Sequence, residues 1–204
     1  MTATVLSAQP GVYRVPNPNL ELFVRRRYLT PAACAALVGQ IDQKRRPSTI
    51  ADSIGDDAFR TSETCDLDGA DPVVAAVNAA ICGLTGLDSA HGEPMQGQRY
   101  AVGQEFKAHT DYFEPAGADF QRYCAVAGQR TWTVMIYLNE PEDGGGTLFR
   151  DVNLMIRPET GSLVAWNNLD AAGRPNPWTI HHGMKVLAGT KYIVTKWFRE
   201  RPWG

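Results

Sequence analysis

The segment His109-Thr110-Asp111 offers the clearest starting point for chemistry in this sequence. Side chains two positions apart on a strand point to the same face, so an imidazole and a carboxylate would enter one pocket. Two histidines and one carboxylate that leave coordination positions open form the usual non-haem Fe(II) site. The His-x-Asp pair would therefore supply two of the three ligands of such a site.

A second histidine-acid pair of the same spacing, His91-Gly92-Glu93, stands in a different context. A glycine lies inside it and Pro94 follows it, which is typical of a turn. We therefore expect His91 to lie on a surface loop.

The third ligand would have to come from the distant pair His181 and His182, because the chain has only four histidines. Both stand at the end of a strand-like run. Neighbouring residues of a strand face opposite sides, so at most one of the two can enter the pocket of His109. The residue pattern alone leaves this choice open.

Other catalytic patterns are weak in this sequence. Gly144-Gly145-Gly146 lacks the Gly-Lys-Ser/Thr tail of a phosphate loop and suits a hairpin or bulge. There is no Gly-x-Ser-x-Gly nucleophile elbow. The four cysteines form no Cys-x-x-Cys pair, which excludes zinc ribbons and thioredoxin-like motifs, and none has an activating neighbourhood.

Composition indicates one ordinary globular domain. The chain has 204 residues, 21% of them charged and 44% hydrophobic, with a formal net charge of −2. These values exclude disorder or a coiled coil for the whole chain and predict no nucleic-acid or membrane partner. The first residues resemble no signal peptide, and no apolar run approaches the ~18 residues of a membrane span. We expect a cytoplasmic protein with reduced thiols, monomeric or homodimeric.

The elements that must position the candidate ligands follow from local patterns. Thr30-Pro31 and Asp71-Pro72 each place a capping side chain before a proline, which predicts two helices. Eight short runs of β-branched and aromatic residues then predict strands: Gln98–Val102, Phe106–His109, Thr131–Leu138, Thr147–Arg150, Leu154–Ile156, Ser162–Trp166, Thr179–His182 and Tyr192–Arg199. Their number and turn signals favour a helix-buttressed β-sandwich or barrel.

Two segments carry weaker patterns. Residues 1–20 are rich in proline, and we expect an arm or a first edge strand there. Tyr112–Gln129 is an 18-residue stretch without a strand pattern. Loops of this length inside a domain are often functional, so we expect a lid over the pocket.

Several segments resemble, in the right order, the prolyl 4-hydroxylase type of Fe(II)/2-oxoglutarate dioxygenases. Arg99 to Asp111 is similar to the family's RYxxGQxFxxHxD segment, and Thr131–Leu138 to its RxxTxxxYL strand. Gly145–Phe149 resembles GGxTxF with one residue missing. The last two matches are Pro158–Leu163, which resembles PxxGxAL, and His181–Trp197, which resembles HxGxPV…GxK…TKW. Lys185 stands where the family has proline, and Gly144-Gly145-Gly146 replaces the family's usual Gly-Gly-Glu.

The resemblance implies a double-stranded β-helix, or jelly roll, with N-terminal helices. It implies one domain over 21–204, with helical support over about 28–90 and the jelly-roll core over about 96–200. It places the metal ligands at His109, Asp111 and His181, because the family's distal histidine stands ten residues before its lysine. It places 2-oxoglutarate beside five further residues: Tyr100, Tyr137, Thr147, Lys191 and Trp197.

The resemblance also implies an activity: Fe(II)- and 2-oxoglutarate-dependent hydroxylation of an unactivated C–H bond by O₂, with ascorbate as an added reductant. A prolyl residue in a peptide or protein is the expected substrate. A free amino acid or small metabolite is the alternative with the same chemistry. An alternative of another class is a non-catalytic jelly-roll module that binds a metal or ligand, or a zinc hydrolase. The lysine at position 191 argues against that class, because a hydrolase has no use for it.

Overall fold

The computed structural model describes residues 1–48, 59–117 and 120–203. Residues 49–58 of the predicted helical support and residues 118–119 of the predicted lid lie outside this part. Within it, no helix is long and apolar enough to cross a membrane. All four cysteines belong to the described part and are free thiols.

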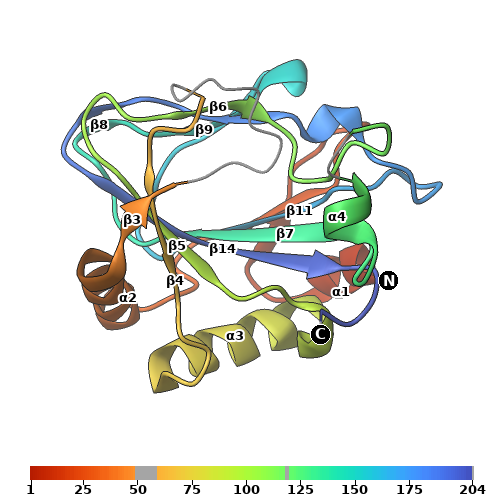
Figure 1. Ribbon diagram of the computed structural model, residues 1–204, viewed down its shortest axis with the longest axis horizontal. Coiled ribbons are helices and arrows are strands. Elements are labelled where there is room, and N and C mark those ends of the chain that lie inside the picture. Colours follow the sequence, from red (N-terminus) through yellow and green to blue (C-terminus); the bar gives the residue numbers. More distant parts are fainter. Residues whose placement is uncertain (49–58, 118–119, 204) are drawn as a thin grey trace.

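The larger sheet contains eight strands in the described residues, and every neighbouring pair is antiparallel. In spatial order they are β1 (Val12–Arg14), β2 (Leu22–Arg25), β11 (Leu163–Asn167), β7 (Arg130–Tyr137), β14 (Lys191–Arg199), β5 (Gln96–Tyr100), β4 (Glu63–Asp66) and β3 (Arg46–Pro47). The long strands β7 and β14 form its centre (Figure 1).

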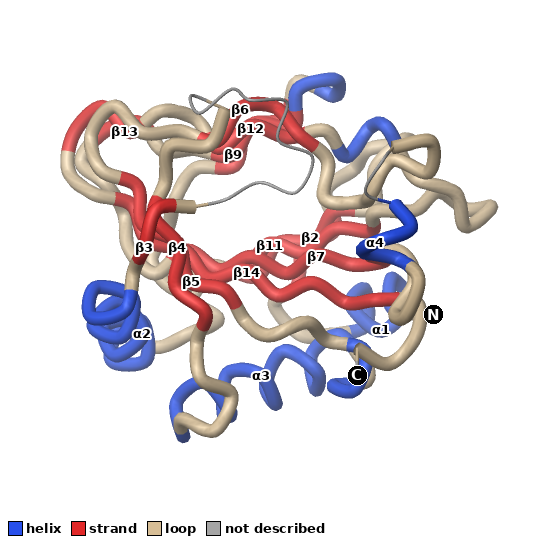
Figure 2. Tube along the Cα trace, in the orientation of Figure 1, coloured by secondary structure: helices blue, strands red, loops and turns tan. Residues whose placement is uncertain are grey.

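A smaller antiparallel sheet faces the larger one (Figure 2). Its four described strands are β10 (Leu154–Ile156), β9 (Thr147–Phe149), β12 (His181–Gly183) and β6 (Phe106–His109). A further pair, β8 (Asp143–Gly144) and β13 (Val186–Ala188), forms a short ribbon. The eight predicted strands are all present, with ends that differ by one or two residues. Two facing antiparallel sheets confirm the predicted sandwich.

Helices cover the outer face of the larger sheet, opposite the smaller sheet (Figure 2). Three helices of the described residues cover this face: α1 (Thr2–Ala8), α2 (Pro31–Lys44) and α3 (Pro72–Thr85). The short helix α4 (Phe120–Cys124) lies near the strand ends and not on this face (Figure 2), and 3-10 turns occur at Ser89–His91, Arg150–Val152 and Pro177–Thr179. Thr30 caps α2 by accepting a hydrogen bond from the Ala33 N–H, and Asp71 caps α3 in the same way. Both predicted helices are confirmed, with a proline at each first position.

Alternation along the central strands creates two separate cores. On β7, Val134 and Ile136 pack toward α1, α2 and α3. Met135 and Tyr137 of the same strand point between the two sheets. The inner face of the larger sheet is therefore one wall of the space that the smaller sheet covers.

The N-terminal segment is more ordered than an arm. Residues 12–14 form β1, which is the expected edge strand. Before it comes α1, which the sequence analysis missed, with Leu6 fully buried in the core under the helices. The helix depends on this tertiary contact, because a seven-residue helix is marginal by itself.

Candidate active site

A cavity lies between the two sheets. Seven of the eight side chains predicted for the site line it: Tyr100, His109, Asp111, Thr147, His181, Lys191 and Trp197. The eighth, Tyr137, lies just behind Thr147, and the two hydroxyls are 2.7 Å apart in a hydrogen bond. Residues scattered over half the sequence therefore meet in one space.

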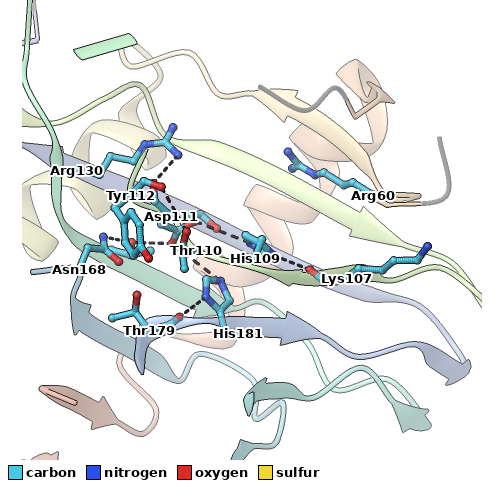
Figure 3. A network of polar contacts seen from close by, with 12 residues as sticks. Arg60, Lys107, His109, Thr110, Asp111, Tyr112, Arg130, Asn168, Thr179 and His181 are labelled. Carbon is cyan, nitrogen blue, oxygen red and sulfur yellow. Dashed lines mark hydrogen bonds and ion pairs between the residues drawn. The ribbon is translucent and has the colours of Figure 1, made fainter. Parts of the chain in front are cut away.

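His109, Asp111 and His181 form the cluster within the described residues that could hold a metal ion (Figure 3). One donor atom from each lies within 4.8 Å of the others. The carboxylate oxygens of Asp111 lie 3.9 Å from His109 Nε2 and 4.0 Å from His181 Nε2. The two histidines lie close together because the register of the paired strands β6 and β12 places His109 directly opposite His181.

Backbone carbonyls fix the orientation of both imidazole rings. His109 Nδ1 donates to the Lys107 carbonyl at 2.8 Å, and His181 Nδ1 donates to the Thr179 carbonyl at 2.9 Å. A carbonyl can only accept, so Nδ1 of each ring carries a proton, and in the neutral form of the ring the lone pair is then on Nε2. Ligating histidines have this same second contact in metal sites.

Protonation at the site also suits metal binding. Burial, together with the neighbouring His181, lowers the pKa of His109 to about 3, so this imidazole is neutral. Burial by itself would raise the pKa of Asp111. The nearby histidines and Arg130 and a hydrogen bond from Thr133 outweigh that effect and hold the pKa below its ordinary value. Neutral imidazoles and an ionised carboxylate are the forms that bind a cation.

The other two histidines lie away from this cluster. His182 faces the opposite side of β12, where its Nε2 is 2.9 Å from a carboxylate oxygen of Glu105. Lys185 approaches the same carboxylate at 3.6 Å. His91 lies in a 3-10 turn and hydrogen-bonds the Arg199 carbonyl, so it packs against the C-terminal strand, where we had expected a surface loop.

Lys191 is a buried cation on the inner face of β14. Its side chain is almost fully buried, at 1% exposure, and its Nζ lies over the rings of Tyr100 and Tyr137, 4.9 and 5.6 Å from their centroids. No carboxylate pairs with it among the described residues. Burial lowers its pKa to about 7. A buried ammonium without a counter-ion is costly, and an anionic ligand in the cavity would relieve that cost.

The hydroxyl groups near Lys191 have partners within the protein. Tyr100 donates to Gln98 Oε1 at 2.7 Å. Tyr137 is hydrogen-bonded to Thr147, which has 2% exposure and lines the cavity. The rings of Tyr100 and Tyr137 thus lie beside the lysine and Thr147 lines the same cavity, and contact of their hydroxyls with a ligand is a proposal.

The sequence analysis did not predict a cluster of charged residues, Glu93, Arg130 and Arg199, which lies next to Trp197. The Arg130 guanidinium lies 4.1 Å from the centroid of the Trp197 ring and forms hydrogen bonds of 2.6 and 2.8 Å with Glu93. Arg199 donates to the same carboxylate at 3.1 Å. Glu93 was assigned to a turn, and nothing local signals its pairing with residues 37 and 106 positions later.

The segment predicted as a lid, Tyr112–Gln129, contains the helix α4. At its base, the Gln129 side chain both donates to and accepts from the Phe113 backbone, at 2.7 and 2.8 Å. Arg201 donates to the carbonyls of Cys124 and Val126. None of the described residues of this segment after Asp111 lines the cavity. Arg201 thus connects the described part of this segment to the residues that follow β14, and closure of the segment over the site stays a prediction.

Comparison with known proteins agrees with this geometry. The family model described as "2OG-Fe(II) oxygenase superfamily" matches residues 95–199. Prolyl 4-hydroxylase subunit alpha-1 of Rattus norvegicus is 35% identical over 144 residues, which are 70% of this chain and 27% of that protein. Prolyl 4-hydroxylase 2 of Arabidopsis thaliana is 28% identical over 214 residues, 92% of this chain and 70% of that protein. The chain thus spans about a quarter of the length of the subunit alpha-1 relatives it matches.

Solved structures share the fold. The viral collagen prolyl hydroxylase of Paramecium Bursaria Chlorella virus-1, in complex with 2OG, superposes with a TM-score of 0.68 at 24% identity, over 87% of this chain and 95% of that one. A prolyl-4-hydroxylase of Pseudomonas putida gives 0.61 at 19% identity, over 98% and 100%. These likenesses confirm the double-stranded β-helix.

Proposed function

The chain belongs to the 2OG-Fe(II) oxygenase superfamily, and on that premise we propose that it hydroxylates a prolyl residue in a peptide or protein. The expected prolyl 4-hydroxylase resemblance is confirmed by the curated relatives. The single observation that carries the proposal is one cavity that holds both the His109, Asp111 and His181 cluster and the ammonium of Lys191, with which no carboxylate pairs within the described part of the chain.

The donor set fits Fe(II). Two imidazole nitrogens with free lone pairs and one ionised carboxylate form the facial triad typical of non-haem Fe(II) oxygenases. We propose that His109, Asp111 and His181 hold the metal. His182 cannot replace His181 without a turn of the strand, because it hydrogen-bonds Glu105 on the other face.

The surroundings of Lys191 fit 2-oxoglutarate. We propose that its ammonium binds the distal carboxylate, and that hydroxyls of Tyr100, Tyr137 and Thr147 complete the polar end of the site. When bound, Fe(II) and 2-oxoglutarate would supply the oxidising chemistry: 2-oxoglutarate and O₂ give succinate and CO₂, with one oxygen atom of O₂ in succinate and the other in the new hydroxyl group of the substrate.

The chain's own residues have three tasks in this reaction. The histidine and aspartate side chains keep the metal on one wall of the cavity. Lys191 fixes the far end of the co-substrate, so that its reactive end faces the metal. Trp197 and Trp166, which are 8% and 1% exposed and line the cavity, exclude water from the reacting atoms.

Curated relatives named as prolyl 4-hydroxylases support a prolyl substrate. A peptide substrate is supported by a prolyl hydroxylase of Trichoplax adhaerens with the same fold, whose structure is in complex with a peptide fragment of the oxygen degradation domain of hypoxia inducible factor. We propose a peptide or protein substrate for this chain as well, with ascorbate as an optional reductant.

The test is succinate release from 2-oxoglutarate in the presence of Fe(II), with a proline-rich peptide or free proline added separately. Release that is stimulated by the peptide and lost in His109→Ala supports the proposal. Stimulation by free proline alone would assign a small-molecule substrate. Equal release from wild type and His109→Ala would contradict the oxygenase assignment. Omission of ascorbate in a parallel series tests its role.

A further inference from the structure

Asp111 is connected to the larger sheet, whereas the two clustered histidines belong to the smaller sheet. His109 and His181 stand on the paired strands β6 and β12, and each ring is held by a carbonyl two residues before it. Asp111 follows β6, but its Oδ2 accepts a hydrogen bond of 2.7 Å from the hydroxyl of Thr133 on β7. The carboxylate is therefore placed from across the sandwich.

Thr133 is itself held by a second buried side chain. Asn168 Nδ2 donates to Thr133 Oγ1 at 2.9 Å. The backbone N–H of Asn168 donates to the Thr131 carbonyl at 2.7 Å, and its own carbonyl accepts from the Asn176 N–H at 2.9 Å. Thr133 and Asn168 are both 0% exposed, so neither side chain has water as an alternative partner.

The chemistry of the three groups fixes the direction of this chain of hydrogen bonds. An ionised carboxylate can only accept, so the Thr133 hydroxyl proton goes to Asp111. A hydroxyl has one proton, so Thr133 must accept from Asn168, and the amide must present its N–H. The direction of each hydrogen bond thus determines the direction of the next, so the three side chains have one hydrogen-bonding arrangement.

We propose that Thr133 and Asn168 form a positioning relay that holds the Asp111 carboxylate at metal-binding distance from His109 and His181. The inference rests on the proposed metal centre. Thr133 fixes the carboxylate directly, and Asn168 acts through Thr133 by orienting its hydroxyl. Neither touches the metal, so both are positioning residues. Without the relay, the Asp111 side chain would be free to rotate away from the two Nε2 atoms.

The test is titration of the metal-free protein with Co(II), followed by its visible absorption. Thr133→Val removes the hydroxyl at similar shape, and we expect about 10- to 100-fold weaker Co(II) binding and an altered spectrum, as for other outer contacts of metal ligands. Thr133→Ser keeps the hydroxyl and should restore both. Thr85→Val is the matched control, because Thr85 is also 0% exposed but donates to the Ile81 carbonyl in α3. It should leave Co(II) binding unchanged.

The variant Asn168→Leu distinguishes a role of Asn168 through the Thr133 hydroxyl from a role in packing alone. If Asn168 acts through Thr133, this variant weakens Co(II) binding less than Thr133→Val, and the double variant is no weaker than Thr133→Val alone. Circular dichroism checks that each variant is folded. If Thr133→Val does not fold, the Co(II) affinities of Thr133→Ser and Asn168→Leu still test the relay.

Three results would overturn the relay: wild-type Co(II) affinity and spectrum in Thr133→Val, no rescue by Thr133→Ser, or full additivity of the two substitutions. A different failure points to the metal centre itself. If wild type and His109→Ala bind Co(II) equally, the proposed function fails, whatever the Thr133 variants do.

Discussion

The ammonium of Lys191 lies 4.9 Å from the centroid of the Tyr100 ring, inside the cavity that contains the histidine cluster. The two residues stand directly opposite one another on β14 and β5. A cation over an aromatic face gains some stabilisation, on the order of 2 kcal/mol when it is desolvated. That is less than a buried charge loses, so the Lys191 ammonium lowers stability, which is the behaviour expected if Lys191 binds an anionic ligand as proposed.

Replacement of Lys191 should have opposite effects on the stability of the ligand-free protein and on its affinity for 2-oxoglutarate. Lys191→Met removes an unpaired buried charge, so we expect the ligand-free protein to be more stable at pH 7 or below. We expect 2-oxoglutarate binding to weaken on the order of 10- to 100-fold, the worth of a hydrogen bond to a charged group. Thermal unfolding with and without 2-oxoglutarate measures both. Lys196→Met is the control, since Lys196 is buried on the other face of the strand and does not line the cavity. Wild-type ligand affinity in Lys191→Met would contradict the assignment.

The pH dependence of stability gives a second test of the same residue. The pKa of Lys191 is lowered from 10.5 to about 7 in the folded protein, so the unfolded chain binds more protons between these values. Stability due to this group therefore rises with pH from about 7 to 10.5, and the cost of burying the charge is complete below pH 7. The advantage of Lys191→Met over wild type should shrink across this window, by a few kcal/mol in total. A constant difference in unfolding free energy from pH 6.5 to 9.5 would show that Lys191 does not titrate there.

The two adjacent histidines should differ sharply in metal binding. His181→Ala removes a donor of the cluster, so we expect loss of stoichiometric metal binding. His182→Ala removes a contact with Glu105 on the other face and should retain the metal. Metal content after reconstitution and desalting measures the difference. Retention by His181→Ala with loss by His182→Ala would reverse the assignment.

The buried pair of Glu93 and Arg130 makes a prediction about folding. Arg130→Met leaves Glu93 partly uncompensated, with Arg199 as its remaining partner. We expect a loss of about 3 kcal/mol in unfolding free energy, as found when one member of a buried ion pair is removed. Urea unfolding measures it. Arg174→Ala breaks the exposed pair with Asp170 and should cost at most about 1 kcal/mol. Equal effects of the two substitutions would mean that the buried pair has no special role.

Local signals in the sequence were sufficient for the elements that depend on local chemistry. The capped starts of α2 and α3 follow from Thr30 and Asp71 beside prolines. The strands with strong alternation, such as β7 and β14, also follow from their own residues. In contrast, α1, β4 and α4 are short, and contacts with residues far away in the sequence stabilise them. No pattern in their own residues predicts them.

Some residues of the candidate site could likewise be predicted from local sequence patterns, whereas others could not. His109 and Asp111 are suggested by spacing on a strand, whereas the choice between His181 and His182 needed the family pattern. The structure brings His181 toward the cluster and turns His182 to Glu105, because consecutive residues of β12 alternate. Thr133 lies 22 positions from Asp111 on another sheet, and such contacts across a sandwich depend on tertiary packing.

Incorporation of labelled oxygen into a proline-containing peptide tests the central proposal most directly. The protein is incubated with Fe(II), 2-oxoglutarate and the peptide under isotopically labelled dioxygen, and the peptide is analysed by mass spectrometry. We expect wild type to add one labelled oxygen atom to a prolyl ring with one succinate formed per hydroxylation, and His109→Ala to add none. An unmodified peptide despite succinate release, or equal labelling by His109→Ala, would contradict prolyl hydroxylation at this site.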